Sequence, residues 1–393
     1  MSPIGIIIYP PTIDYDYLLQ RPQQLLRSFS ELEIPSLFLN NNIFLKERGV
    51  RKINPFFYVI NDIDIKPYLK NIKPVVYFTL PDHIKMVKQY NPSLIVFDSI
   101  DEPTEEFSAW GTHYYSALEN SHIVLATSHK LYNKALEINP ETHLVPNGCD
   151  YHFFNRASKK TLEIPEDMRS IKRPIIGFIG AVSTWCDFEL IGNLARSFPD
   201  CSIVMVGPYL NVNELPKHAN LYWLGGKPYE QLASYAQLFD VGIIPFRVSS
   251  MIESVNPIKM WEYMAVGMPV VTTALPEVLK YSDLLLYSED QEQFIENIKI
   301  ALYNDTLQKR QQRMKLAWQN SWKIRAQKIK GIIENKLIIQ DNVITKTDTA
   351  LKRLIETLNN MPDHIRDINS INNVRIGRPG FRYSTDKREK KRG

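Results

Sequence analysis

Lys259 and Glu262 have the residue types and the spacing that fit a charged small molecule. They lie three positions apart in a segment with helical spacing, so both side chains share one helix face. A lysine ammonium can neutralise phosphate, and a carboxylate can accept hydrogen bonds from both hydroxyls of a ribose. The pair therefore fits a sugar nucleotide. A surface ion pair, which would stabilise the helix by only about 0.2–0.5 kcal/mol, is the alternative, and spacing alone favours neither.

The residues that precede this pair favour an anion at the same place. Asn256 is the expected N-cap of the helix, and Pro257 suits its first turn because proline has no N–H group to lose. The free N–H groups of a helix N-terminus attract anions such as a diphosphate. After the helix, Gly267 and Pro269 lead into an apolar strand. We therefore expect a ligand-holding turn here.

Short apolar runs alternate with helical patterns along most of the 393 residues. Apolar runs flanked by helices indicate parallel strands that are covered on both faces, and this length suggests two domains. We predict an α/β protein with two Rossmann-like domains, residues 1–155 and 174–305, joined by a polar linker, residues 156–173. A helical segment, 306–337, and an extension with a basic tail, 338–393, follow. Ligands of such sheets bind beyond the carboxyl ends of the strands, so the cleft between the domains is the expected site.

The strands expected in the two domains follow from the short apolar runs. In the first domain they are Gly5–Tyr9, Ser36–Leu39, Phe57–Ile60, Val75–Thr79, Leu94–Asp98, Ile123–Thr127 and His143–Pro146. In the second domain they are Pro174–Ile179, Ser202–Val206, Leu221–Leu224, Val241–Pro245, Val270–Thr272 and Leu284–Tyr287.

Composition excludes several classes of protein. No apolar run approaches the roughly 18 to 20 residues of a membrane span, and the N-terminus lacks the basic region of a secretory signal. The three cysteines have no pattern that indicates disulfides or zinc. We therefore expect a cytoplasmic protein.

The formal net charge of +4 is unevenly distributed. Residues 375–393 contain eight cationic and two acidic residues, a net charge of +6, and the remainder of the chain carries −2. This tail could contact anionic lipid at the inner face of the membrane, or it could simply be solvated. Nucleic acid is not an expected partner, because no basic patch with stacking aromatics recurs in the body of the chain.

The stretch Ser254–Thr272 resembles the C-terminal nucleotide-binding motif of GT-B glycosyltransferases, and is most similar to the subgroup of the teichuronic acid biosynthesis glycosyltransferases. Every fixed position of the pattern NPxKxxEYxAxGxPVV is present. Other matching segments occur in the same order: Gln20–Gln24, Val96–Glu102, Ala126–Ser128, Val145–Asp150, Ile176–Gly180 and Phe239–Phe246. The resemblance covers roughly residues 4 to 335. It implies a GT-B fold with an acceptor-side first domain, a nucleotide-sugar-binding second domain and a last helix that packs back on the first, where Trp318 and Trp322 could make the contact.

The donor side is implied by this resemblance together with residue chemistry. Glycine after a strand lets a phosphate approach the backbone, and Gly207, Pro208 and Gly225 resemble loops that shape the base pocket, where Tyr209 or Tyr229 could stack or simply lie on the surface. The expected donor-binding residues are Gly180, Gly207, Pro208, Arg247, Ser254, Asn256, Lys259 and Glu262.

The sequence departs from the family pattern at two places on the donor side. No arginine or lysine follows the glycine turn within Thr184–Phe188, so Lys259 and then Arg247 are the candidates for charge compensation. Ser254 stands where many retaining relatives have the first of two glutamates, with Glu253 beside it.

The first domain offers candidates for catalysis and for acceptor binding. Asp98 and Asp101 end a strand and bracket a turn, and either could act as a base or orient the acceptor hydroxyl. An Asx-turn or a helix N-cap is the alternative for both. Arg21 could bind an anionic acceptor or form a structural ion pair. His113 is the histidine that best fits acceptor binding.

We interpret the chain as a glycosyltransferase that moves a sugar from a nucleotide diphosphate sugar, UDP-linked by preference, to a hydroxyl of a glycan or lipid-linked glycan. Retention of the anomeric configuration is implied by the resemblance. No cofactor or metal is expected, since no Asp-x-Asp matches a family site; Lys259 would stabilise the leaving diphosphate. The alternatives are an inactive GT-B-like assembly protein and, with less support, a sugar-nucleotide epimerase.

Overall fold

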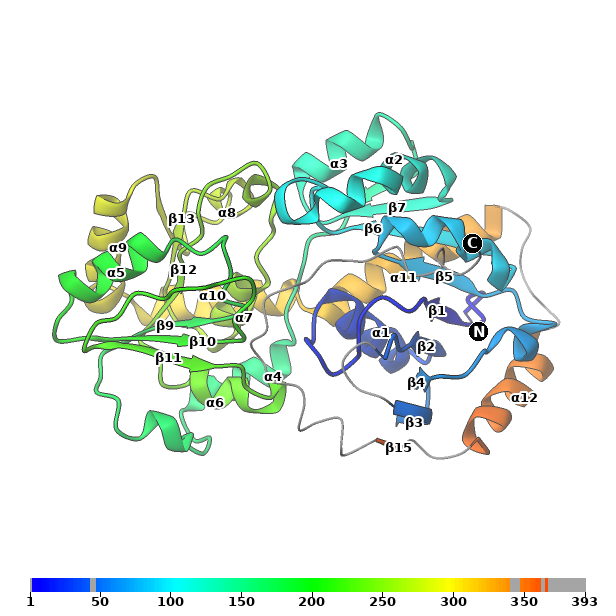
Figure 1. Cartoon of the computed structure of the whole chain (residues 1–393), viewed down its shortest axis with the longest axis horizontal. Helices are drawn as coiled ribbons and strands as arrows, with labels where there is room; N and C mark the ends of the chain where they lie inside the picture. Colours follow the sequence, from blue (N-terminus) through cyan, green and yellow to red (C-terminus); the bar gives the residue numbers. More distant parts are fainter. Residues whose placement is uncertain (1, 43–46, 340–346, 362–364, 367–393) are drawn as a thin grey trace, which may run out of the picture.

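The chain folds into two α/β domains that lie side by side, each with one central sheet (Figure 1). The structure is a computed structural model, and it describes residues 2–42, 47–339, 347–361 and 365–366. The basic tail, residues 375–393, lies outside the described residues. Within the described ranges, no helix is long and apolar enough to cross a membrane.

The first sheet has the strand order β15-β3-β4-β2-β1-β5-β6-β7-β8. Its strands are parallel except for β3, which pairs antiparallel with both β4 and β15. The sequence did not indicate β3, because the residues of this strand do not form a continuous apolar run. The bounds are β1 Ile7–Tyr9, β2 Ser36–Leu39, β3 Glu47–Asn54, β4 Phe57–Asn61, β5 Val75–Phe78, β6 Leu94–Ser99, β7 Ile123–Ala126, β8 Thr142–Leu144 and β15 Ile365–Arg366.

Helices cover both faces of the first sheet because successive strand residues point to opposite sides. Ile7 and Tyr9 pack with α1 (Arg21–Glu31) and α11 (Trp322–Ile339), while Ile6 and Ile8 pack with α2 (Gly111–Asn120), α3 (His129–Leu136) and α12 (Thr347–Asn359). Short 3-10 helices lie in the connections: η1 Lys66–Leu69, η2 Pro81–Lys85, η3 Val87–Tyr90 and η4 Glu105–Trp110.

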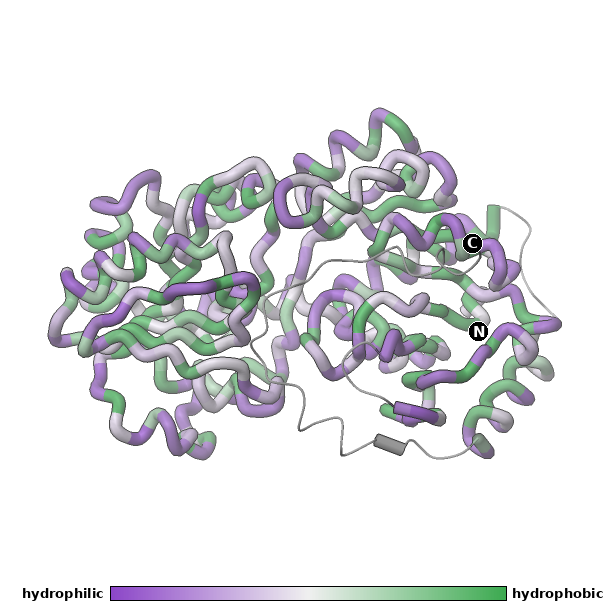
Figure 2. The backbone as a smooth tube through the Cα atoms, viewed as in Figure 1, coloured by the Kyte–Doolittle hydropathy of each residue, from purple (hydrophilic) through white to green (hydrophobic). Residues whose placement is uncertain are grey.

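The second sheet has the order β11-β10-β9-β12-β13-β14, with every pair parallel. The order reverses between β9 and β12, where doubly wound sheets bind ligands at the strands' carboxyl ends. The bounds are β9 Ile175–Ile179, β10 Ser202–Val206, β11 Leu221–Gly225, β12 Val241–Ile244, β13 Val270–Thr273 and β14 Leu286–Ser288. The helices are α5 Phe188–Ser197, η7 Tyr229–Gln231, α6 Leu232–Ala236, η8 Ile252–Ser254, α7 Ile258–Val266, α8 Pro276–Leu279 and α9 Gln291–Tyr303. Figure 2 shows hydrophobic residues concentrated along the central strands of both domains.

The segment expected to be a linker is part of the second domain's core. It contains η5 (Arg156–Lys159) and η6 (Glu166–Met168), preceded by α4 (Tyr151–Asn155), and Ala157, Met168 and Ile171 are buried with the second sheet. Its polar sequence concealed this packing, because the buried apolar side chains are widely spaced.

The helical segment expected from 306 to 337 is two helices separated at Asn320–Ser321. The first, α10 (Leu307–Gln319), packs against α7 in the second domain, and α11 packs against α1 in the first. Trp322 is buried in the first-domain core, whereas Trp318 is 51% exposed, so only one of the two indoles makes the expected contact.

The break between α10 and α11 receives the turn at Gly148. The backbone carbonyl of Cys149 accepts a hydrogen bond from the backbone N–H of Trp322 at 3.0 Å. A Cβ atom on Gly148 would lie 2.4 Å from the carbonyl oxygen of Asn320. The turn and the helix break are therefore in backbone contact. Glycine is required here for close approach.

Gly148→Ala should lower the free energy of unfolding by about 1–3 kcal/mol, because the new methyl group meets backbone that cannot rotate away. The matched control is Gly331→Ala within α11, where no atom lies within 4 Å of the added Cβ. That control should raise stability by about 0.5–1 kcal/mol through helix propensity. Urea unfolding of both variants measures the difference, and equal effects would contradict the packing described here.

Candidate functional site

Two glycine turns in contact form the base of the candidate site. Gly180 follows β9 and Gly207 follows β10, with φ angles of +155° and +157°. The Gly180 N–H donates to the Val206 carbonyl at 2.8 Å, and a Cβ atom on Gly207 would lie 1.8 Å from the Gly180 oxygen. Side chains are thus excluded at the carboxyl ends of two neighbouring strands. Glycine at these positions allows the close approach of the two turns to each other and of Lys259 to Gly180.

Lys259, on the first turn of α7, lies directly against Gly180. A Cβ atom on Gly180 would lie 1.9 Å from Lys259 Cε and 2.6 Å from Nζ. The ammonium is 5.7 Å from the ring centre of Phe178 and 5.8 Å from that of Phe246. These aromatic residues belong to β9 and to the end of β12, so the cation is held where the strand order reverses.

Lys259 and Glu262 attract each other electrostatically but make no direct hydrogen bond or ion pair with each other. Both side chains are half-buried, and in the described part of the chain neither has a hydrogen-bond or ion-pair partner. Burial lowers the pKa of Lys259 and raises the pKa of Glu262 to about 7, and the attraction between the two charges opposes both shifts. Two desolvated groups of opposite charge, neither of which forms a direct hydrogen bond or ion pair, are typical of a site completed by a ligand.

The first domain contributes to the surroundings of Glu262. Asp150 adds negative charge that further raises the pKa of Glu262, and Cys149 and Tyr229 are also close enough to interact with it. Tyr229 is already engaged: its hydroxyl accepts a hydrogen bond from Gln24 at 2.9 Å and its ring stacks on Phe153 at 4.7 Å. The proposed stacking of Tyr229 on a base is therefore not supported.

The other expected donor-binding residues differ in how far their side chains are exposed. The Arg247 side chain is exposed. The backbone N–H of Arg247 donates a hydrogen bond to the Trp185 carbonyl at 2.8 Å, beside the glycine turn. Pro208 accepts a hydrogen bond from Val182 at 2.9 Å, which places it over the same turn. The Ser254 hydroxyl is buried and donates to the Met251 carbonyl at 2.7 Å.

Asn256 does not cap α7, contrary to the sequence-based expectation. The N-cap is Pro257, without a side-chain cap, and Asn256 is only 2% exposed. Its Oδ1 accepts hydrogen bonds from the Asn147 N–H at 3.1 Å and from Trp261 Nε1 at 3.2 Å, and its Nδ2 donates to Glu277 at 3.3 Å. One contact between the domains, to Asn147, and two contacts within the second domain therefore use the side chain that capping would have needed.

Asp98 and Arg21 form a buried ion pair, which was the alternative interpretation of Arg21. Nε and Nη2 of Arg21 donate to the two carboxylate oxygens at 2.6 and 3.0 Å, and Tyr77 also donates to Asp98. Both charged side chains are at most 3% exposed. Although burial opposes its charge, these partners raise the pKa of Arg21 above its usual value. Because the two charges are buried and paired with each other, catalysis by Asp98 and acceptor binding by Arg21 are not supported.

Asp101 differs from Asp98 in having no hydrogen-bond or ion-pair partner among the described residues. It is half-buried in the loop that follows β6, and burial raises its pKa to about 7. His113 lies on α2 with Nε2 3.8 Å from Asp82 Oδ1, and both side chains are partly exposed. The roles of Asp101 and His113 stay predictions. In the described ranges, no group of three or more His, Cys, Asp or Glu residues is arranged to hold a metal ion.

Several contacts between the domains were missed from the sequence. The buried Glu277 on α8 accepts hydrogen bonds from the N–H and Nδ1 of His129 at 2.8 and 2.9 Å. Glu105 and Lys130 of the first domain also contact the loop before α7. The sequence around these polar residues has no local pattern that would identify a partner far along the chain.

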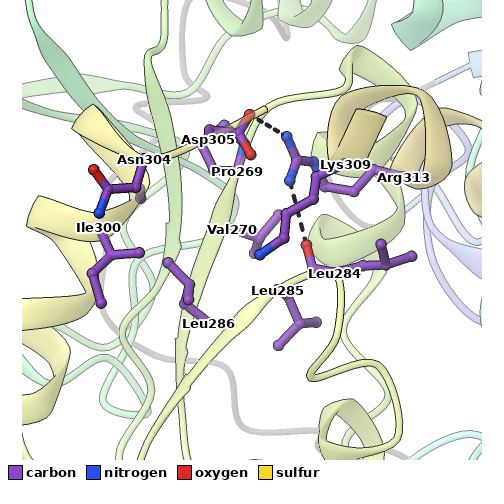
Figure 3. A pocket seen from close by; sticks show the side chains of 11 residues that line it. Pro269, Val270, Leu284, Leu285, Leu286, Ile300, Asn304, Asp305, Lys309 and Arg313 are labelled. Carbon is purple, nitrogen blue, oxygen red and sulfur yellow. Dashed lines mark hydrogen bonds and ion pairs between the residues drawn. The ribbon is translucent and has the colours of Figure 1, made fainter. Parts of the chain in front are cut away.

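A small hollow lies at the amino ends of β13 and β14 (Figure 3). Its arginine, Arg313, is paired with Asp305 at 2.5 Å and with the Gly267 carbonyl at 2.9 Å. This hollow is at the opposite edge of the sheet from Gly180, and its guanidinium is already satisfied. It is therefore not part of the candidate site.

Residues 173–304 match the family described as Glycosyl transferases group 1. The chain is also similar to the Bacillus subtilis (strain 168) protein TuaH, provisionally assigned as a teichuronic acid biosynthesis glycosyltransferase. The two are 31% identical over 165 residues, which span 40% of this chain and 41% of TuaH. The match thus covers less than half of either protein.

Solved structures with the same architecture cover most of the chain. Sucrose-phosphate synthase from Thermosynechococcus elongatus has a TM-score of 0.59 at 14% identity, covering 85% of this chain and 100% of that one. The trehalose-6-phosphate synthase OtsA has 0.60 at 11%, covering 82% and 97%. Anabaena HepE, in complex with UDP and glucose, has 0.59 at 12%, covering 84% and 99%. The chain therefore has a two-domain GT-B fold, and its residues 173–304 match the glycosyl transferases group 1 family.

Proposed function

We propose that this protein transfers a sugar from a nucleotide diphosphate sugar, UDP-linked, to a hydroxyl of a cell-surface polysaccharide precursor or another glycan, including a lipid-linked one. The observation that carries the proposal is the unpaired, half-buried Lys259 and Glu262 beside the turn at Gly180. The group 1 domain and the similarity to TuaH support it, as does the UDP in the complex of HepE.

The donor would bind across the second domain. Its diphosphate would lie over the glycine turns, where Lys259 supplies the nearest cation and the exposed Arg247 a second one. The ribose hydroxyls would donate hydrogen bonds to Glu262. This assignment accounts for both unpaired charges with one ligand.

The transfer step would use the same groups. Negative charge grows on the diphosphate as the bond to the sugar breaks, and the Lys259 ammonium together with the α7 N-terminus would stabilise it. Asp101 replaces Asp98 as our candidate to orient or deprotonate the acceptor hydroxyl, because a carboxyl group with a pKa of about 7 can exchange its proton at neutral pH. Retention of the anomeric configuration and independence from a metal are parts of this proposal, as is action at the cytoplasmic face of the membrane.

An inactive GT-B-like assembly protein is the alternative. It is favoured by the lack of a cationic residue in Thr184–Phe188 and by the buried Ser254. A thermal-shift screen of UDP, GDP, ADP, TDP and CMP and their sugar conjugates, with and without metal, separates the two proposals. A shift in melting temperature for one nucleotide family supports a transferase of that donor class; no shift with any of them supports the assembly protein.

Gly180→Ala should weaken nucleotide-sugar binding by at least about tenfold, because its Cβ would overlap Lys259 Cε and the ammonium must move. Gly192→Ala on α5 is the matched control, since its nearest neighbours would lie at an ordinary 3.6 Å. Isothermal titration with a UDP-sugar measures both affinities. Equal binding by the two variants would contradict the location of the diphosphate.

Donor affinity should rise with pH through about 7. In the proposal Glu262 accepts ribose hydrogen bonds as an ionised carboxylate. Because its pKa is about 7, most of the protein carries a protonated Glu262 below pH 7 and must release that proton when the donor binds. Between pH 6 and pH 8 the Kd for a UDP-sugar, whose diphosphate does not titrate in this range, should fall by about tenfold. Glu262→Gln should bind more weakly and remove this dependence. A slope that survives in the variant would assign it to another group.

A further inference from the structure

A loop of the second domain is held by one carboxylate of the first. Glu105 accepts hydrogen bonds from the hydroxyls of Ser249 and Ser250, both at 3.0 Å, and from the Met251 N–H at 3.2 Å. Burial works weakly against its charge, but these three donors and the nearby Lys130 keep the pKa of Glu105 below its usual value. The carboxylate is therefore ionised and fully engaged at neutral pH.

Lys130 holds the same loop from α3. Its Nζ donates to the Ser250 carbonyl at 2.8 Å and to Glu253 Oε2 at 3.1 Å. Glu253, which stands beside the position where many relatives have a glutamate, thus faces the first domain. Figure 1 shows α3 close to the loops around α8, where the two domains meet.

The loop leads directly into the candidate donor site. Met251, whose N–H is bound by Glu105, accepts hydrogen bonds through its carbonyl from the Ser254 N–H at 3.1 Å and hydroxyl at 2.7 Å. Asn256 and then Lys259 on the first turn of α7 follow. A shift of Met251 would therefore be passed along the backbone to the lysine that we assign to the diphosphate.

The Glu105 backbone is held in an unfavourable conformation. Its φ angle is +49°, a region that residues other than glycine rarely adopt. Such a conformation persists when surrounding contacts impose it. The contacts that Glu105 makes through its side chain are those to the second domain.

We propose that Glu105 and Lys130 are positioning residues that clasp the loop 249–253 and couple closure of the two domains to the placement of Lys259. The proposal rests on the proposed function for the role of Lys259, but the clasp itself needs no ligand. Its groups are largely exposed, so water can replace its partners and salt can screen its charges when the domains separate. The clasp can therefore open and close during turnover.

Closure can be measured directly with spin labels at Leu136→Cys on α3 and Leu279→Cys on α8, both exposed. The native cysteines are buried, so labelling should be selective. Without ligand, the labelled protein should show one short distance. Glu105→Ala with Lys130→Ala should give a longer or broader distribution, and Glu105→Gln an intermediate one, because the amide oxygen can still accept from Met251. Lys299→Ala, which breaks an exposed pair within α9, should leave the distance unchanged.

Measuring donor binding tests whether the clasp is coupled to the placement of Lys259. The Kd for a UDP-sugar should rise by about three- to tenfold in the Glu105→Ala/Lys130→Ala variant and become less sensitive to salt, with an unchanged melting temperature. An unchanged distance distribution would overturn the clasp, and an opened clasp with unchanged affinity would overturn its coupling to Lys259. If the parent protein binds no nucleotide sugar, the proposed function fails, while the distance measurement still decides the clasp.

Discussion

A partly buried hydrogen-bond network centred on Asn147 determines how the two domains meet. Its side chain accepts from Arg21 at 3.2 Å, its carbonyl accepts from Arg325 at 3.2 Å, and its Nδ2 donates to the Asn256 carbonyl at 2.7 Å. Arg21 is neutralised by Asp98, so removing Asp98 would leave a buried charge unpaired, which costs about 3–5 kcal/mol. The turn before the second domain is thereby joined to α1, α11 and the start of α7.

This network explains why chemical type alone misassigned several residues. Arg21, Asp98 and Asn256 were expected to meet ligands, because a cation, a carboxylate and an amide beside a cleft can all do so. The same groups can also satisfy one another across two domains, and sequence spacing does not distinguish these outcomes. By contrast, the strands of the second domain follow from local apolar patterns, and their ends were predicted to within two residues. The antiparallel strand β3 and the break between α10 and α11 depend on distant partners, so they were not predicted.

Lys259 and Glu262 illustrate which part of a site a sequence can reveal. Their shared helix face follows from spacing, but the contact of Lys259 with Gly180 depends on β9 and α7 meeting where the strand order reverses. The absence of a close partner for either charge, in the part of the chain that the structure describes, is likewise a property of the folded protein. The raised pKa of Glu262 follows from burial and from Asp150 of the neighbouring turn, which no local pattern places there.

The two kinds of contact between the domains have different physical properties. The Asn147 network joins a half-buried asparagine to the buried Arg21 and Asn256, so separating it would expose buried polar groups whose only alternative partner is water. The contacts of Glu105 and Lys130 are largely exposed, and their hydration in an open state costs little. A hinge requires one set of contacts that persists and another that exchanges with solvent. The position of Asn147 on the connecting turn suits the first role, and the loop before α7, which ends at the candidate donor site, suits the second.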